Sequence, residues 1–197
     1  MSRNINLAIE TALDGGSFSI FENGREIDFF CNLNSRSTAE DLINIIEKLL
    51  FKNGLDKKAI HKIVYSGGPG SQTGIRIGTA TAKALSFAFD CECSEVSLLY
   101  ALCVYTEKSG FIITAIQVSE KEFCFQGFEK KDVIVAQNQM VRLSRSDFIT
   151  NLSKQNYQQA IIVLKKEDAE IKSFSDDFIL QERQSNFARL LNIVANK

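Results

Sequence analysis

The sequence has very little histidine, proline or tryptophan. It has one histidine, His61, one proline, Pro69, and no tryptophan among its 197 residues. The five cysteines are an odd number, and no two of them form a C-x-x-C pair, so the pattern indicates neither a disulfide framework nor a zinc site. We therefore interpret the cysteines as reduced and mostly buried, and we expect no metal and no cofactor.

Long apolar runs and an excess of charge are also absent. No apolar run approaches the roughly 20 residues that span a bilayer, and the amino end has no signal-peptide pattern. We therefore expect a cytoplasmic protein that makes no contact with a membrane. The net charge is −1 at pH 7, which gives the chain no basic excess for holding nucleic acid unaided. Apolar residues make up 45% of the sequence, which is enough for a hydrophobic core.

The first half of the chain alternates strand and helix patterns, which predicts an α/β layer. Residues 17–21 alternate small polar and large apolar side chains, a period of two that is typical of a strand. Asn23-Gly24 follows and predicts a hairpin, since both central residues of a type I′ turn need positive φ. The predicted strands cover 5–10, 17–21, 25–32, 60–66 and 92–96, and the predicted helices cover 39–50, 75–89 and 98–107.

The second half is less regular, but it also opens with strands and then turns helical, which indicates two related lobes. We predict a first lobe over residues 1–103, joined by the C-terminal helix at about 184–197, and a smaller second lobe over 104–183. We interpret residues 165–177 as surface because they are charged and polar. In this half the predicted strands cover 111–118, 122–128, 132–136 and 160–164, and the predicted helices cover 146–153 and 187–194.

Four glycines lie within residues 67–74, between a predicted strand and a predicted helix. A turn of this kind can direct backbone N–H groups toward an anion, so phosphate binding has to be considered. A Walker A motif needs a lysine directly after its last glycine, where Ile75 stands, and the dinucleotide motif needs a third glycine where Thr73 stands. Neither motif is present, and we do not expect a nucleotide to bind at this loop.

The helix after this loop carries two rows of small residues. Gly74, Gly78 and Ala82 are spaced four residues apart, although a glycine inside a helix is about 1 kcal/mol less favourable than alanine. Small residues at this spacing let another backbone approach closely. The helix can pack on the chain's own sheet or form a seam with a second chain, and both can be true because it carries two such rows. A second row comprises Ala80, Ala84 and Ala88.

The helix over residues 39–50 is apolar on more than one side. A helix that lies on a sheet needs only one apolar stripe. This helix is therefore either buried between two layers of its own chain, or it presents one stripe to a partner. The two stripes are Leu42, Ile45 and Leu49, and Ile43, Ile46 and Leu50.

Residues 66–85, SGGPGSQTGIRIGTATAKAL, resemble the GPGSFTGLRIG-x-ATAKGLA signature of the TsaB (YeaZ) family. Residues 97–102 resemble the family's SSLEALA segment. The resemblance implies an α/β fold that is actin-like (ASKHA and ribonuclease H-like), with two lobes and mixed sheets.

The resemblance also implies a function. Proteins of the TsaB family are non-catalytic subunits that bind the catalytic TsaD protein, with TsaE as an ATPase partner. The assembly places threonylcarbamoyl on adenosine next to the tRNA anticodon. The chain would then contact tRNA only through the complex and would form a homodimer when TsaD is absent. The partner-binding residues that the resemblance implies are Leu42, Ile43, Ile46, Leu50, Gly74, Arg76, Gly78 and Ala82.

By the same resemblance the chain is an inactive paralogue of the TsaD-type carbamoyltransferase. TsaD-type enzymes hold a metal with two histidines on a helix, whereas His61 has no such partner. Actin-like ATPases use an aspartate and a threonine after the first strand. Here Glu10 replaces the aspartate before Thr11, so these two residues mark a degenerate nucleotide region.

Two alternatives stay open. One is an enzyme acting alone, either an actin-like ATPase that uses Glu10 and Thr11 or a peptidase, although no H-E-x-x-H or G-x-S-x-G motif supports the latter. The other is an RNA-binding module, for which dispersed basic side chains would have to converge. Those side chains are Arg25, Arg36, Lys57, Lys58, Lys62 and Arg76.

Overall fold

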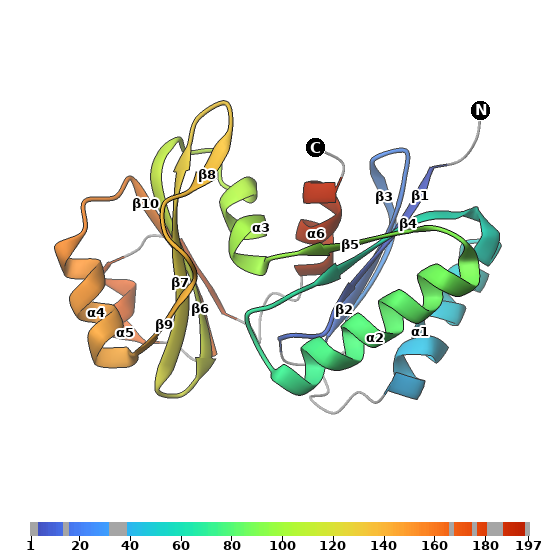
Figure 1. Cartoon of the computed structure of the whole chain (residues 1–197), viewed down its shortest axis with the longest axis horizontal. Coiled ribbons are helices and arrows are strands. Elements are labelled where there is room, and N and C mark those ends of the chain that lie inside the picture. Colours follow the sequence, from blue (N-terminus) through green and yellow to red (C-terminus); the bar gives the residue numbers. More distant parts are fainter. Residues whose placement is uncertain are drawn as a thin grey trace. The chain divides into compact units, whose positions relative to one another are not determined.

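Two separate β-sheets organise the chain (Figure 1). The computed structural model describes residues 4–13, 16–31, 39–165, 168–174, 177–180 and 187–195. One unit contains the described residues up to Leu98 together with the C-terminal helix, and the other begins at Leu99. Within the described ranges no helix has both the length and the apolar composition needed to cross a membrane.

The first unit is built on a five-stranded sheet in the order β3-β2-β1-β4-β5. The first three strands form an antiparallel meander, and β4 and β5 extend the sheet in parallel with β1. Asn23 and Gly24 have φ values of 51° and 79°, as a type I′ turn requires, so the predicted hairpin is confirmed. The strands are β1 (Ile5–Glu10), β2 (Ser17–Glu22), β3 (Arg25–Cys31), β4 (Ile60–Ser66) and β5 (Glu92–Val96).

Helices cover both faces of this sheet. Phe18 of β2 packs into a core with side chains of α1 and α2. The neighbouring Ser17 and Ser19 point to the opposite face, where the Ala188 N–H donates to the Ser17 hydroxyl at 3.1 Å and the Asn192 amide donates to the Ser19 carbonyl at 3.2 Å. The alternation in β2 therefore serves two buried faces. The helices are α1 (Ala39–Lys52), α2 (Gln72–Phe89) and α6 (Phe187–Ala195), and the 3-10 helix η1 (Lys57–Ala59) precedes β4.

The second unit is built on a mixed sheet in the order β11-β10-β6-β7-β8, with β9 also paired to β7. Its core includes Phe148 of α4, whose ring stacks on that of Phe123 in β7 with centroids 4.6 Å apart. The strands are β6 (Gly110–Ser119), β7 (Glu122–Lys130), β8 (Ile134–Ala136), β9 (Val141–Ser144), β10 (Gln159–Leu164) and β11 (Asp177–Leu180). The helices are α3 (Leu98–Tyr105), α4 (Arg145–Lys154) and α5 (Ala169–Lys172).

Two sequence predictions about element positions need correction. The helix expected from residue 75 begins at Gln72, because the Ser71 hydroxyl accepts from the Gly74 N–H and caps it. The segment interpreted as surface, residues 165–177, contains α5, and Ile171 of α5 is fully buried in the core of the second unit. The charged neighbours hide the apolar character of Ile171 and of Phe174, which is partly buried against the same core.

The glycines of the loop and of α2 are explained by the close approach of the segment that follows β1. A Cβ atom on Gly70 would overlap the Ala12 carbonyl oxygen, and one on Gly74 would overlap that of Thr11. A Cβ atom on Gly78 would overlap the Thr11 hydroxyl. Only glycine fits these positions without movement of the neighbouring chain. The first row of small residues therefore packs within the chain.

Replacing Gly74 with alanine is expected to lower the free energy of unfolding by at least about 2 kcal/mol, because the new methyl group overlaps the Thr11 carbonyl. Chemical denaturation followed by circular dichroism measures this change. Ala84→Ser, on the exposed side of the same helix, is the matched control and should change the free energy by less than about 0.5 kcal/mol. Equal stability of Gly74→Ala and the natural protein would contradict the packing account.

Candidate functional site

The structure divides the predicted partner-binding residues into a buried group and an exposed group. Leu42 and Ile46 are each 1% exposed in the core beneath α1, and Ala82 of α2 is completely buried. Their side chains pack within the chain itself, and a role of these residues in partner binding stays a prediction. The buried group comprises Leu42, Ile46, Leu50, Gly78 and Ala82, and the half-buried Gly74 lies against Thr11.

The exposed sides of α1 and α2 carry large apolar side chains. Phe51 of α1 is 90% exposed, Phe87 of α2 is 91% exposed, and the predicted Ile43 of α1 is 44% exposed. The two helices pack against each other in the first unit (Figure 1). Several exposed large apolar side chains on neighbouring helices are typical of an interaction site. We call this region the α1–α2 surface; it comprises Ile43, Phe51, Ala80, Ala84, Phe87 and Ala88.

Helical spacing places one set of α2 side chains on an exposed side of the helix. Arg76, Ala80, Lys83 and Phe87 recur at intervals of three or four residues, and all four are exposed. The glycine row lies on another side of the helix, against the turn after β1. The predicted Arg76 thus belongs to the exposed side, together with the second row of small residues.

Sequence analysis missed both phenylalanines. Ile43, Glu47 and Phe51 are spaced four residues apart along α1 and are all exposed, but Phe51 lies just beyond the predicted helix end at residue 50. The available signal was this four-residue spacing, extended by one turn. Phe87 lay inside the predicted helix, where a single aromatic residue among alanines does not reveal its exposure.

The glycine loop between β4 and α2 uses its backbone N–H groups within the chain. The Ser71 N–H donates to the Ala12 carbonyl at 2.7 Å, and the Gly74 N–H donates to the Ser71 hydroxyl at 3.2 Å. The Gly68 N–H donates to the Ser66 hydroxyl at 3.1 Å. A phosphate-binding loop directs such groups at its ligand. These hydrogen bonds agree with the missing Walker A and dinucleotide motifs.

The predicted degenerate nucleotide region is engaged in the same packing. Glu10 is 2% exposed, and its carboxylate accepts hydrogen bonds from the Ala12 and Leu13 N–H groups. The Thr11 hydroxyl donates to the Gly74 carbonyl at 2.8 Å. Both residues therefore shape the turn after β1 and its contact with α2.

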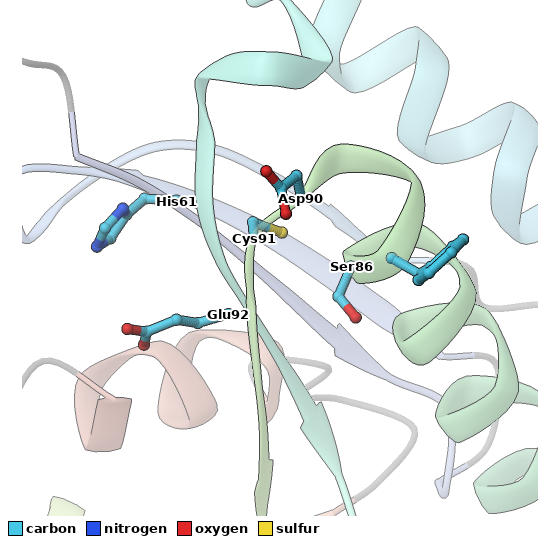
Figure 2. Close-up of a pocket in the computed structure, with 6 residues that line it drawn as sticks. His61, Ser86, Asp90, Cys91 and Glu92 are labelled. Atoms are coloured by element: carbon cyan, nitrogen blue, oxygen red, sulfur yellow. The ribbon is translucent and has the colours of Figure 1, made fainter.

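A pocket of about 580 Å³ opens where the carboxyl end of α2 meets the amino ends of β4 and β5 (Figure 2). Figure 2 shows the side chains of His61 and Glu92 pointing away from Ser86. The Ser86 hydroxyl donates to the Lys83 carbonyl at 3.0 Å, and burial raises the pKa of the Cys91 thiol, which keeps that thiol protonated near neutral pH. These side chains do not form the nucleophile–base pair that covalent catalysis needs. The lining residues are His61, Ser86, Phe87, Asp90, Cys91 and Glu92.

The remaining chemistry-bearing residues are dispersed. Over the described ranges, no three or more His, Cys, Asp or Glu side chains are grouped to hold a metal ion. The cysteines are free, but Cys93 is exposed and Cys31 and Cys91 are half-buried, so the expectation that most are buried is wrong. Of the basic residues considered for RNA binding, Arg36 lies outside the described residues. The others lie on β3 (Arg25), η1 (Lys57 and Lys58), β4 (Lys62) and α2 (Arg76).

Comparisons with known proteins agree with the sequence resemblance. A family model described as TsaD, tRNA N6-adenosine threonylcarbamoyltransferase, matches residues 31–115. The Haemophilus influenzae protein named tRNA threonylcarbamoyladenosine biosynthesis protein TsaB is 28% identical over 96 residues, which are 49% of this chain and 40% of that protein. YeaZ from Pseudomonas aeruginosa aligns with a TM-score of 0.61 at 18% identity, covering 81% of this chain and 75% of the YeaZ chain. The resemblance to the TsaB (YeaZ) family is confirmed.

The TsaB-like part of the sequence and the fold differ in extent. The match to Haemophilus influenzae TsaB spans less than half the length of that protein, and the TsaD family model stops within β6. The fold likeness extends over nearly the whole chain. A Bacteroides thetaiotaomicron protein described as having an actin-like ATPase fold aligns with a TM-score of 0.51 at 14% identity, covering 97% of this chain and 96% of its own. The predicted actin-like α/β fold with mixed sheets is therefore confirmed.

A tyrosine and a carboxylate meet at the end of β4, beside the TsaB-like glycine loop. The Tyr65 hydroxyl donates to the Glu95 carboxylate at 3.1 Å. Burial, then the hydrogen bond to Glu95 and its negative charge, raise the pKa of Tyr65 to about 12. The Glu95 side chain also fills the space beside Gly67, where a Cβ atom would overlap it.

Tyr65 is expected to titrate near pH 12. Because its pKa in the folded state lies above the ordinary value of 10.0, its contribution to stability is present below pH 10 and is lost as the pH rises toward 12. Ultraviolet absorbance titration of the natural chain and of Tyr65→Phe isolates the group. Glu95→Gln should lower the pKa of Tyr65, and an unchanged titration in that variant would contradict the contact.

Proposed function

We propose that this chain is a non-catalytic subunit of the assembly that installs threonylcarbamoyl on adenosine next to the tRNA anticodon, and that it binds the catalytic TsaD protein. The relative named for threonylcarbamoyladenosine biosynthesis and the match to the TsaD family model support this proposal. In the proposed assembly TsaE is the ATPase partner and tRNA is contacted only through the complex. The protein acts in the cytoplasm.

The observation that carries the proposal is the exposure of Phe51 and Phe87 on two helices that pack together. Burying a side chain of this size is about 1.5–3 kcal/mol more favourable than leaving it exposed to water. Aromatic side chains are enriched among the residues that dominate binding energy at protein interfaces. The chain's own core does not use these two rings, and burial against a partner gives them a physical role.

The alanine row of α2 suits a helical partner. Ala80, Ala84 and Ala88 leave the helix backbone covered only by methyl groups, so a second helix can approach to roughly 8 Å between axes. Arg76 and Lys83 lie along the same exposed side and add positive charge. A partner with acidic side chains at the rim of its contact region would match this charge.

The same surface would hold a second copy of the chain when TsaD is absent. An apolar surface can be covered only once, so TsaD and the second copy compete for it. Adding TsaD should therefore convert a homodimer into a one-to-one complex, and the fraction converted should follow the TsaD concentration.

Three features support the absence of catalysis by this chain alone. The Ser86 hydroxyl is engaged with the Lys83 carbonyl, and the raised pKa of Cys91 keeps its thiol protonated. Three backbone N–H groups of the glycine loop, those of Gly68, Ser71 and Gly74, donate to acceptors of the chain itself. A partner enzyme would then supply the reacting groups.

Phe87→Glu and Ala84→Arg are each expected to weaken association with TsaD from the same source by at least about 100-fold, because each places a charge in the contact region. Size-exclusion chromatography with light scattering shows the complex, and calorimetric titration gives the Kd. Val133→Glu is the matched control, since Val133 is also apolar and 70% exposed but lies in the second unit. It should leave the Kd unchanged.

Two outcomes would count against the proposal. If Phe87→Glu binds TsaD with the same Kd as the natural chain, the α1–α2 surface is not part of the interface. A natural chain that forms no complex with TsaD, while folded, would remove TsaD as the partner. Circular dichroism of each variant checks that loss of binding is not loss of fold.

A further inference from the structure

The buried carboxylate of Glu10 is the group that the proposed function leaves unexplained. Glu10 is the last residue of β1 and is 2% exposed. A buried charged group is strongly unfavourable unless hydrogen bonds replace the water it has lost. Glu10 therefore has to be held by specific donors.

Two backbone donors converge on one oxygen of this carboxylate. The Ala12 N–H donates to Glu10 Oε1 at 2.6 Å, and the Leu13 N–H donates to the same atom at 3.0 Å. Consecutive backbone N–H groups that point at one position form the concave arrangement by which proteins bind anions. Here the anion in that position belongs to the chain itself.

The turn held by Glu10 also supports the start of α2. The Ala12 carbonyl accepts from the Ser71 N–H at 2.7 Å, and the Thr11 hydroxyl donates to the Gly74 carbonyl at 2.8 Å. One side of the turn thus binds the carboxylate, and the other side packs on the glycine row. Loss of the carboxylate would leave two buried N–H groups without their acceptor, at a place where the turn cannot easily move away.

We propose that Glu10 fills an oxyanion-binding site of its own chain, and that a small carboxylate anion binds between the Ala12 and Leu13 N–H groups when the side chain is removed. Glu10→Ala removes a CH2–COO− fragment, which has the shape and charge of acetate. In the natural chain these N–H groups are not available to a phosphate. The proposal concerns the turn after β1 and is independent of the α1–α2 surface, so partner-binding assays do not decide it.

Thermal unfolding of Glu10→Ala with and without acetate tests the proposal. The substitution should lower the Tm by roughly 5–10 °C, because two hydrogen bonds to a charged group are lost. Acetate should restore at least half of that loss, while sodium chloride at the same ionic strength should not. Ile9→Ala, at the adjacent and fully buried position, is the matched control, because it leaves a cavity without anion donors and its Tm should not respond to acetate. An equal effect of acetate and chloride on Glu10→Ala, or a Glu10→Ala variant as stable as the natural chain, would overturn the proposal.

If Glu10→Ala does not fold, Glu10→Gln gives a second test by nuclear magnetic resonance of the full chain. Glutamine keeps the size of the side chain but removes its charge, so the Ala12 and Leu13 amide protons should shift upfield and exchange faster with solvent. Inorganic phosphate should leave both amide signals of the natural chain in place. Amide signals that do not change in Glu10→Gln, or that shift saturably with phosphate in the natural chain, would overturn the proposal.

Discussion

The first unit depends on how closely the turn after β1 approaches the start of α2. The carbonyl oxygens of Thr11 and Ala12 lie where side chains of residues 70 and 74 would otherwise be. This steric constraint accounts for glycines that by themselves weaken a helix. It also allows two hydrogen bonds between these segments, from the Ser71 N–H to the Ala12 carbonyl and from the Thr11 hydroxyl to the Gly74 carbonyl. The glycine loop resembles a nucleotide-binding loop in composition, but its glycines serve the close packing of α2 against the turn after β1.

Fixing one side of α2 against the turn determines what its other side presents. The row that contains Gly78 and Ala82 is buried, so the row of Ala80, Ala84 and Ala88 has to face outward. With Phe87 beside that row and Phe51 on the neighbouring α1, the outward side carries large apolar side chains that do not belong to the core. The TsaB-like signature therefore has two effects: its glycines hold the fold together, and its alanines leave the helix accessible.

Local features of the fold could be predicted from the sequence because they depend on neighbouring residues. The Asn23-Gly24 turn and the alternation of β2 are examples, since φ preference and a period of two are readable over a few positions. The partner-binding residues are harder to predict, because the sequence of α1 has two apolar stripes and does not indicate which of them lies on the sheet. The glycine row could not be assigned without knowing that Thr11, more than 60 positions earlier, lies against it.

The candidate site shows the same division. The sequence shows that Glu10 stands where actin-like ATPases have an aspartate. Its hydrogen bonds to the Ala12 and Leu13 N–H groups depend on a turn conformation that no local pattern encodes. Ile171 was hidden among charged residues, and its burial depends on contacts made across the second unit. Sequence patterns are enough to identify the important helices and strands. Tertiary contacts determine which side of each is buried and which is exposed.

The position of α6 has a consequence for the order of events during protein synthesis. Asn192 is hydrogen-bonded to Ser19 across 173 positions of the chain, so the face of the first sheet that α6 covers stays exposed until this helix has been synthesised. The second unit lies between these segments in the sequence and can complete its own core earlier. The first unit, which carries the α1–α2 surface, therefore completes this side of its core after the second unit has been synthesised. A product that stops before α6 would carry the α1–α2 surface on a unit whose sheet has one face exposed.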